Sequence, residues 1–260
     1  MIELRHISKR FVENVVLDDV SFDVHDGETV ALLGPSGVGK SVTLKMINGL
    51  LRPDSGDVEV DGLHVPTLGR RELAALRTGI GYVFQYGALF DSMSVSDNIR
   101  LGITHEEQYR DESYCVARVA ECLRLVNLTP DVGAKFPAEL SGGMKKRVGI
   151  ARAIAGKPKY LLYDEPTSGL DPMNADVIDG LVERLQNELG VTSVVVSHDV
   201  RGSFRVADRV ALLWQGKLRA VGTAEEFLAS RDPAVQQFLE RDLEMAVIQS
   251  ESEDHSRHGS

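Results

Sequence analysis

The chain has 260 residues, 43% hydrophobic content and a formal net charge of −10 at pH 7. This length accommodates one large domain or one domain with an insertion, the apolar fraction is ample for a core, and the negative charge argues against nonspecific nucleic-acid binding. No run approaches the ~18 consecutive apolar residues that cross a bilayer, and residues 1–5 lack a basic region followed by an apolar signal core. We therefore expect the chain to stay in the cytosol.

The first predicted elements are two strands of a small antiparallel sheet. Apolar and polar residues alternate over Ile2–Ile7 and Val20–Val24, which is the period of strands with one exposed face. Three later runs, at 29–33, 160–163 and 193–196, are continuously apolar, and each leads into a loop and then a helical pattern. Such runs are typical of a parallel sheet covered on both faces, so the sequence predicts the α/β class with an antiparallel β subdomain.

A complete G-x-x-x-x-G-K-[ST] motif, the Walker A pattern, follows the first continuous run at Gly34–Ser41. Its glycines lack side chains, so backbone N–H groups can close around phosphate oxygens at a helix N-terminus. Lys40 would supply a point charge to the β- and γ-phosphates of a nucleotide, and Ser41 a hydroxyl to Mg²⁺. A buried strand precedes the motif and a helical run begins at Val42, which favours a phosphate loop over a glycine-rich turn without a ligand.

The middle of the chain has a different apolar pattern. Between Gln85 and Pro158 the spacing becomes helical, as at Val116 and Val119, and no buried-strand run intervenes. We therefore expect an inserted helical subdomain at about 87–158.

Two adjacent carboxylates, Asp164 and Glu165, follow the strand predicted at 160–163, at the end where α/β sheets place ligands. Their side chains point in opposite directions, as successive strand residues do. Asp164 suits Mg²⁺ coordination, and Glu165 can face an attacking water as general base. The alternative is a solvated strand end, which the phosphate loop in the same chain disfavours.

Five ordered motifs together resemble the ATP-binding cassette (ABC) ATPases. This resemblance runs from Ile2 to about Gly222 and implies a P-loop, RecA-like ABC ATPase core that binds ATP and Mg²⁺ and hydrolyses ATP. The motifs are Gly34–Ser41, Gln85 after the run 80–84, Leu140–Met144, Asp164–Asp171, and His198 after the run 193–196.

The resemblance also implies a role for each motif residue. His198 would contact the γ-phosphate and keep the water and the carboxylate aligned, although a lone His after a strand is more often structural. Gln85 would sense Mg²⁺ and the attacking water while hinging the helical subdomain. Phe11 lies where the family keeps an aromatic that stacks on adenine, and the alternative for an isolated Phe is a core position. The implied catalytic residues are Glu165, His198 and Gln85, the implied metal ligands are Ser41, Gln85 and Asp164, and the implied nucleotide-binding residues are Phe11, Gly34, Pro35, Ser36, Gly37, Val38, Gly39, Lys40, Ser41, Val42, Ser141, Gly142 and Gly143.

Leu140–Met144 resembles the signature loop of the family. Ser141 is predicted to cap a helix, and Gly142 and Gly143 allow close backbone approach to a phosphate. The helix predicted at Lys145–Ala155 aims its positive end at that anion.

The signature loop implies a pair of chains. In the family this loop serves the ATP held by the other subunit, so one phosphate loop and one signature loop in a chain imply a head-to-tail homodimer with ATP at its interface. Residues 168–171 match the loop that links the two sites across the pair. Met144 stands where the family usually has Gln, which removes a polar group that could reach the ribose.

A finer resemblance is to the Mla/Mce lipid-trafficking group, through Gln85–Asp91, Met144 and residues 232–239. These systems move phospholipids or other lipids between bacterial envelope membranes, with a permease and an Mce-type lipid-binding protein. The chain is thus expected to be the ATPase subunit of a bacterial ABC transporter, peripheral at the cytoplasmic face of the inner membrane, and not to bind nucleic acid.

Three alternative classes of protein were compared with this assignment. ATPases of importers for amino acids or other small solutes share most of the remaining residues. A non-transport ABC protein would carry a long coiled-coil insertion or two cassettes, and a P-loop kinase would lack Leu140–Gly143; neither pattern matches this chain.

The expected domain division is an ABC ATPase domain at 1–225, a C-terminal amphipathic helical extension at 226–249, and a disordered tail at 250–260. Apolar residues at intervals of three and four predict a helix from about Pro233 to Val247. Its apolar stripe packs either on its own subunit or across the partner ATPase, and the sequence leaves both open. The stripe consists of Val235, Phe238, Leu239, Leu243 and Ala246.

Overall fold

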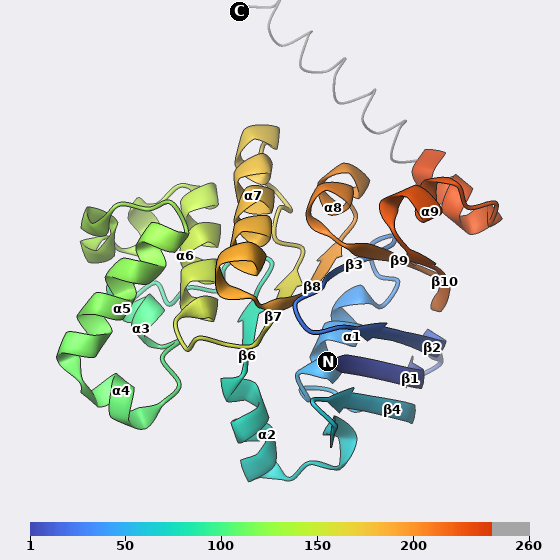
Figure 1. Ribbon diagram of the computed structural model, residues 1–260, viewed down its shortest axis with the longest axis horizontal. Helices are drawn as coiled ribbons and strands as arrows, with labels where there is room; N and C mark the ends of the chain where they lie inside the picture. The colour runs from blue at the N-terminus through green and yellow to red at the C-terminus, as the bar shows by residue number, and fades with distance from the viewer. Residues whose placement is uncertain (241–260) are drawn as a thin grey trace, which may run out of the picture.

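The computed structural model describes residues 1–240, and two β-sheets organise this part of the chain (Figure 1). The larger sheet has the strand order β10-β9-β3-β8-β7-β6, in which only the β10–β9 pair is antiparallel. The smaller sheet is antiparallel throughout, in the order β2-β1-β4-β5. The strands are β1 (Ile2–Phe11), β2 (Asn14–Val24), β3 (Thr29–Leu33), β4 (Ser55–Val60), β5 (Leu63–His64), β6 (Ile80–Val83), β7 (Tyr160–Asp164), β8 (Thr192–Ser197), β9 (Arg209–Trp214) and β10 (Lys217–Gly222). The predicted α/β class with an antiparallel β subdomain is confirmed.

Strands β3, β7 and β8 of the larger sheet are buried almost throughout because both faces of the sheet are covered there. In β3, Val30 and Leu32 pack into the cluster that the sheet shares with the smaller sheet. Ala31 and Leu33, which point the other way, pack into a cluster with helices on the opposite face. The strands predicted from continuous apolar runs are therefore confirmed as β3, β7 and β8.

Helices α7, α8 and α9 lie along one side of the larger sheet, whereas α1 lies on the other side with the smaller sheet (Figure 1). None of the helices within residues 1–240 is long and apolar enough to cross a membrane. The helices are α1 (Lys40–Ile47), α2 (Arg70–Thr78), α3 (Val95–Arg100), α4 (Glu106–Arg110), α5 (Glu112–Leu125), α6 (Gly142–Ile154), α7 (Pro172–Leu189), α8 (Val200–Val206) and α9 (Ala224–Leu228), with short 3-10 turns η1 (Val65–Thr67), η2 (Pro130–Ala134) and η3 (Pro137–Glu139).

Helix α6 begins three residues earlier than the sequence predicts. Its first residue is Gly142, not Lys145. The hydroxyl of Ser141 accepts a hydrogen bond from the backbone N–H of Met144 at 3.2 Å, so this serine caps the helix directly and both glycines fall in its first turn. The early start places the signature loop at the N-terminus of α6 itself.

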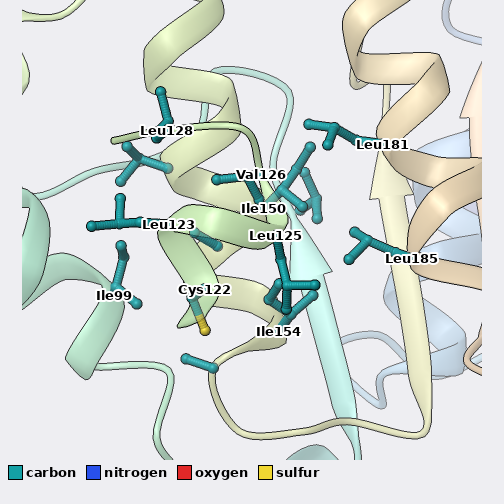
Figure 2. Packing of buried hydrophobic residues seen from close by; sticks show 14 of the residues in the cluster. Ile99, Cys122, Leu123, Leu125, Val126, Leu128, Ile150, Ile154, Leu181 and Leu185 are labelled. Atoms are coloured by element: carbon teal, nitrogen blue, oxygen red, sulfur yellow. The ribbon is translucent and has the colours of Figure 1, made fainter. Parts of the chain in front are cut away.

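The segment between β6 and β7 is built from helices α3 to α6 and contains no strand. Figure 2 shows its core, where Leu125 of α5 and Ile150 of α6 lie opposite Leu181 and Leu185 of α7. These side chains belong to one buried cluster, so the helical segment is joined to α7 by shared apolar packing. The boundaries 87–158 of a separate helical subdomain stay a prediction.

Residues 233–240 are helical, in line with the helix expected near this end of the chain. Val235 and Phe238 are buried at 0% and 6% exposure and pack with Leu33 of β3 and Phe227 of α9. The part of the apolar stripe that the structure describes therefore packs on its own subunit. Leu243 and Ala246, like the tail predicted at 250–260, lie outside the described residues.

Candidate active site

The phosphate loop connects β3 to α1 and depends on glycine at two crowded positions. Gly34 has φ 150°, and a Cβ there would lie 2.2 Å from the carbonyl oxygen of Leu213 in β9. Gly39 has φ 113°, and a Cβ there would lie 2.8 Å from a methyl carbon of Leu17 in β2. Both backbone conformations are costly for other residues. The loop is thus held tightly between two strands at the start of α1.

Lys40, the first residue of α1, is only 4% exposed. Its ammonium donates to the carbonyl oxygens of Gly34 at 2.7 Å and Pro35 at 3.1 Å. It also forms an ion pair with Glu165, with 3.2 Å between Nζ and Oε1. The lysine therefore lies inside the phosphate loop and beside the second of the two predicted carboxylates.

Ser41 and Asp164 are brought together, as their predicted roles require. The Ser41 hydroxyl donates to Asp164 Oδ1 at 2.5 Å. The other oxygen of this carboxylate accepts a hydrogen bond from the hydroxyl of Tyr82 at 3.0 Å. Burial and the adjacent Asp164 carboxylate raise the pKa of Tyr82, so its hydroxyl stays protonated and remains a donor. Tyr82 was not among the residues predicted from the sequence. Its only sequence signal is a polar hydroxyl within the short apolar run 80–83, which became β6 next to β7.

Glu165 leaves the line of β7 through a left-handed backbone conformation, with φ 50°. Its N–H donates to Val196 of β8 at 3.0 Å, and its side chain accepts a hydrogen bond from His198 Nδ1 at 2.6 Å. This turn separates the two carboxylates, so that Asp164 faces Ser41 while Glu165 faces Lys40 and His198.

The charge states of Glu165 and His198 depend on each other. Burial opposes ionisation of Glu165, but the hydrogen bond from His198 and the charge of Lys40 outweigh it and hold the pKa of this carboxyl below its usual value. The same hydrogen bond raises the pKa of His198 above the ordinary histidine value. Near neutral pH the pair is therefore biased toward imidazolium and carboxylate.

Replacing His198 with Gln is expected to destabilise the protein in a pH-dependent way. Because the pKa of His198 is raised on folding, the charged ring contributes stability below about pH 6.5 and loses it as pH rises through the raised pKa. The difference in melting temperature between wild type and His198→Gln should thus shrink from about pH 6 to about pH 9. His105→Gln, at an exposed position, is the control. A difference that stays constant over this range would show that the contact is not ionic.

Gln85 follows β6 and points to the loop after Glu165. Its side-chain amide donates to Ser168 Oγ at 3.3 Å. No hydrogen bond joins it to Ser41 or Asp164 within residues 1–240, so the structure places Gln85 beside the turn that follows Glu165 and not in contact with the other two predicted metal ligands. A residue that sequence reasoning missed lies on the other side of Ser168: the Lys146 ammonium donates to the Ser168 carbonyl oxygen.

The signature loop lies apart from the phosphate loop of the same chain. Ser141 and Gly142 are exposed, and a Cβ on Gly143 would lie 2.6 Å from the side-chain oxygen of Asn174 in α7. In the described part of the chain, none of these residues forms a hydrogen bond with Gly34–Ser41. Figure 1 shows α6 and α1 separated by β7, β8 and α7.

Phe11 ends β1 and is 43% exposed. Its ring stands 5.6 Å from the ammonium of Lys9, a cation–π arrangement. The alternative of a core position is therefore wrong for this residue, and its exposed face is open to stacking.

The oxygen atoms near the phosphate loop suit Mg²⁺ that is also bound by substrate phosphates, and they do not form a complete metal site made of protein ligands. No group of three or more His, Cys, Asp and Glu side chains within residues 1–240 is arranged to hold a metal ion. Ser41 Oγ and Asp164 Oδ1 instead supply two adjacent hard oxygen atoms. Mg²⁺ is usually bound by one or two such groups together with substrate phosphates, and the residues present fit that pattern.

Comparison with known proteins gives consistent matches. A family model described as ABC transporter matches residues 17–168. The probable ribonucleotide transport ATP-binding protein mkl of Mycobacterium leprae is 39% identical over 98% of this chain and 73% of its own length. The intermembrane phospholipid transport system ATP-binding protein MlaF of Haemophilus influenzae is 39% identical over 92% of this chain and 90% of its own length. A solved dimer of the ATP-binding cassette MJ0796 with ADP and Pi superposes with a TM-score of 0.78 and 32% identity, covering 86% of this chain and 99% of that one.

Proposed function

This chain belongs to the ABC transporter family as the ATPase subunit of a bacterial transporter, and from that premise we propose that it energises phospholipid or other lipid trafficking across the cell envelope. The observation that carries the lipid assignment is its near full-length likeness to the phospholipid transport ATPase. Gln85–Asp91 and Met144, which resemble the same group, support it. An importer ATPase for amino acids or other small solutes is the second candidate, favoured by 41% identity over 92% of this chain to the methionine import ATP-binding protein MetN of Carboxydothermus hydrogenoformans.

In the proposed hydrolysis reaction the clustered side chains take separate roles. Lys40 neutralises the β- and γ-phosphates of ATP, and the N–H groups of the phosphate loop surround them. Glu165 accepts the proton of the attacking water, and His198 orients the Glu165 carboxylate through the 2.6 Å hydrogen bond. Gln85 reaches the same turn through Ser168. The contacts between Lys40, Glu165 and His198 support this division of labour.

Mg²⁺ would be held by Ser41 and Asp164, where it supplies charge neutralisation for the phosphates. Tyr82 donates to the Asp164 oxygen that does not face Ser41. This hydrogen bond orients the carboxylate and leaves its Oδ1 directed at the serine hydroxyl. Phe11 is proposed to stack on adenine with its exposed face.

Two copies of the chain are proposed to close head to tail. Ser141 and Gly142 are exposed at the N-terminus of α6, where backbone N–H groups and the helix dipole attract an anion. In the pair this end would face the ATP bound by the phosphate loop of the partner. The solved dimer of a related cassette supports such an assembly.

The permease contact is proposed to lie beside the segment Gln85–Phe90. Phe84, Tyr86 and Phe90 are 43%, 78% and 55% exposed, and large aromatic side chains exposed together are typical of an interaction surface. The chain would then lie at the cytoplasmic face of the inner membrane, below two permease subunits that connect it to an Mce-type lipid-binding protein.

Purification of the chain together with its membrane subunits tests the lipid assignment. The complex is expected to retain phospholipid or another lipid that mass spectrometry detects after extraction, and its ATP hydrolysis should increase in lipid nanodiscs compared with detergent. A panel of ribonucleotides and amino acids should leave the hydrolysis rate unchanged. A complex that carries no lipid above the level of an unrelated transporter, and that such a solute stimulates, would establish the small-solute importer instead.

A further inference from the structure

Ser168 joins three parts of the site through three different atoms. Its N–H donates to the carbonyl oxygen of Glu165 at 3.2 Å. Its hydroxyl accepts from Gln85 at 3.3 Å, and its carbonyl oxygen accepts from the ammonium of Lys146. The position of this one residue therefore depends on the catalytic turn, on the loop after β6 and on α6.

Lys146 is the least expected member of this group. Its side chain is only 7% exposed, and burial lowers its pKa to about 8 despite the nearby Glu165 carboxylate. A buried ammonium is costly unless it is hydrogen-bonded. Its bond to Ser168 therefore gives the side chain a definite position, unlike that of a surface lysine.

Helix α6 contacts the active-site loops at two separate points. Besides Lys146, Arg152 donates to the carbonyl oxygens of Gly87 and Ala88 at 2.8 and 2.7 Å. A Cβ on Gly149 would lie 3.0 Å from Gly87, so the helix and the loop after Gln85 are in direct contact. Gln85 thus lies between a loop fixed by Arg152 and a serine fixed by Lys146.

We propose that Lys146 is a positioning residue that holds Ser168 against α6 and thereby sets Gln85 and the turn of Glu165 for hydrolysis. The inference rests on the proposed function. Ser141, which would serve the ATP of the partner, begins the same helix whose Lys146 touches the loop of the chain's own site. A shift of α6 on closure at one site would therefore reach the catalytic turn of the other through this contact.

The test compares Lys146→Met, Lys146→Arg and Lys145→Met in the full-length protein, assembled with its permease. Methionine keeps the apolar stem of Lys146 and removes the ammonium, arginine restores a charged donor, and Lys145 is the adjacent lysine on the same helix, less buried than Lys146. Lys146→Met is expected to lower kcat roughly tenfold with ATP affinity changed less than about twofold, and to reduce the Hill coefficient for ATP toward one. Lys146→Arg should recover most of both values, and Lys145→Met should match wild type.

A double-mutant cycle with Ser168→Ala provides a second measurement. Ser168→Ala removes the hydroxyl that accepts from Gln85 and keeps the carbonyl oxygen that accepts from Lys146. If Lys146 sets Gln85 by holding Ser168 in place, the losses in kcat from Lys146→Met and Ser168→Ala will therefore not add. If Lys146→Met does not fold well enough to assay, Lys146→Gln replaces it with the same expectations.

Three results would overturn the proposal: a kcat within twofold of wild type, a fall in ATP affinity as large as that in kcat, or additive losses in the cycle. Glu165→Gln is assayed in parallel. If Glu165→Gln remains active, the proposed hydrolysis mechanism with Glu165 as general base fails; if it is inactive while Lys146→Met matches wild type, only the role of Lys146 fails.

Discussion

Glu165→Gln is expected to lower steady-state ATP hydrolysis by at least about 100-fold, the usual scale for loss of a general base, while ATP binding remains nearly intact. The amide keeps the shape of the side chain but cannot accept the proton of water. It also removes a negative charge 3.2 Å from Lys40. Because that charge competes with the phosphates for the lysine, ATP affinity should be maintained or increased.

The measurement is a comparison of hydrolysis rate with equilibrium ATP binding for the same purified complex. With ATP and Mg²⁺ the variant should also accumulate as a closed dimer on size-exclusion chromatography. Glu183→Gln is a suitable control, since Glu183 is an exposed glutamate on α7. Hydrolysis within a few-fold of wild type in the assembled transporter would rule out Glu165 as the base.

Mixed dimers should reveal which residues share a site. If Lys40→Ala is on one chain and Ser141→Arg is on the other, both defects fall in one composite site and the second site stays intact. If both changes are on the same chain, each site carries one defect. The first arrangement should therefore retain about one tightly bound nucleotide per dimer, and the second should retain almost none.

The structural basis for this prediction is that Ser141 is exposed and Lys40 buried within one subunit. Ser141→Arg also removes the hydroxyl that caps α6, at a cost of about 1 kcal/mol. Dimers carrying each single change against a wild-type chain control for this loss. Equal nucleotide occupancy in the two double arrangements, measured on co-expressed chains with different tags, would contradict the head-to-tail model.

The sequence predicted the fold and the candidate site best where a single motif determines both the type of a residue and its place at the end of a strand. Continuous apolar runs located β3, β7 and β8, and the roles implied by the motifs paired Ser41 with Asp164 and Glu165 with His198. For Glu165 and His198 the reason is that they follow β7 and β8, and residues at the carboxyl ends of adjacent parallel strands are neighbours.

Contacts between different motifs could not be predicted in this way. Tyr82 reaches Asp164 because β6 pairs with β7 at the register of Tyr82 with Leu162, and a local pattern does not contain that register. Lys146 was missed for a similar reason, since its partner is a backbone carbonyl in a loop more than twenty residues away. The spacing of apolar residues along a helix does not distinguish a buried lysine from an exposed one.

The ion pair between Lys40 and Glu165 has a consequence for the order of events in a catalytic cycle. On the proposed function, an incoming γ-phosphate attracts the same ammonium that now stabilises the carboxylate. Once Lys40 has exchanged partners, Glu165 loses part of the electrostatic stabilisation of its ionised form, so its proton affinity increases. Arrival of the substrate would thus strengthen the base that takes the proton from the attacking water, and without substrate the same base remains weak and neutralised by the lysine.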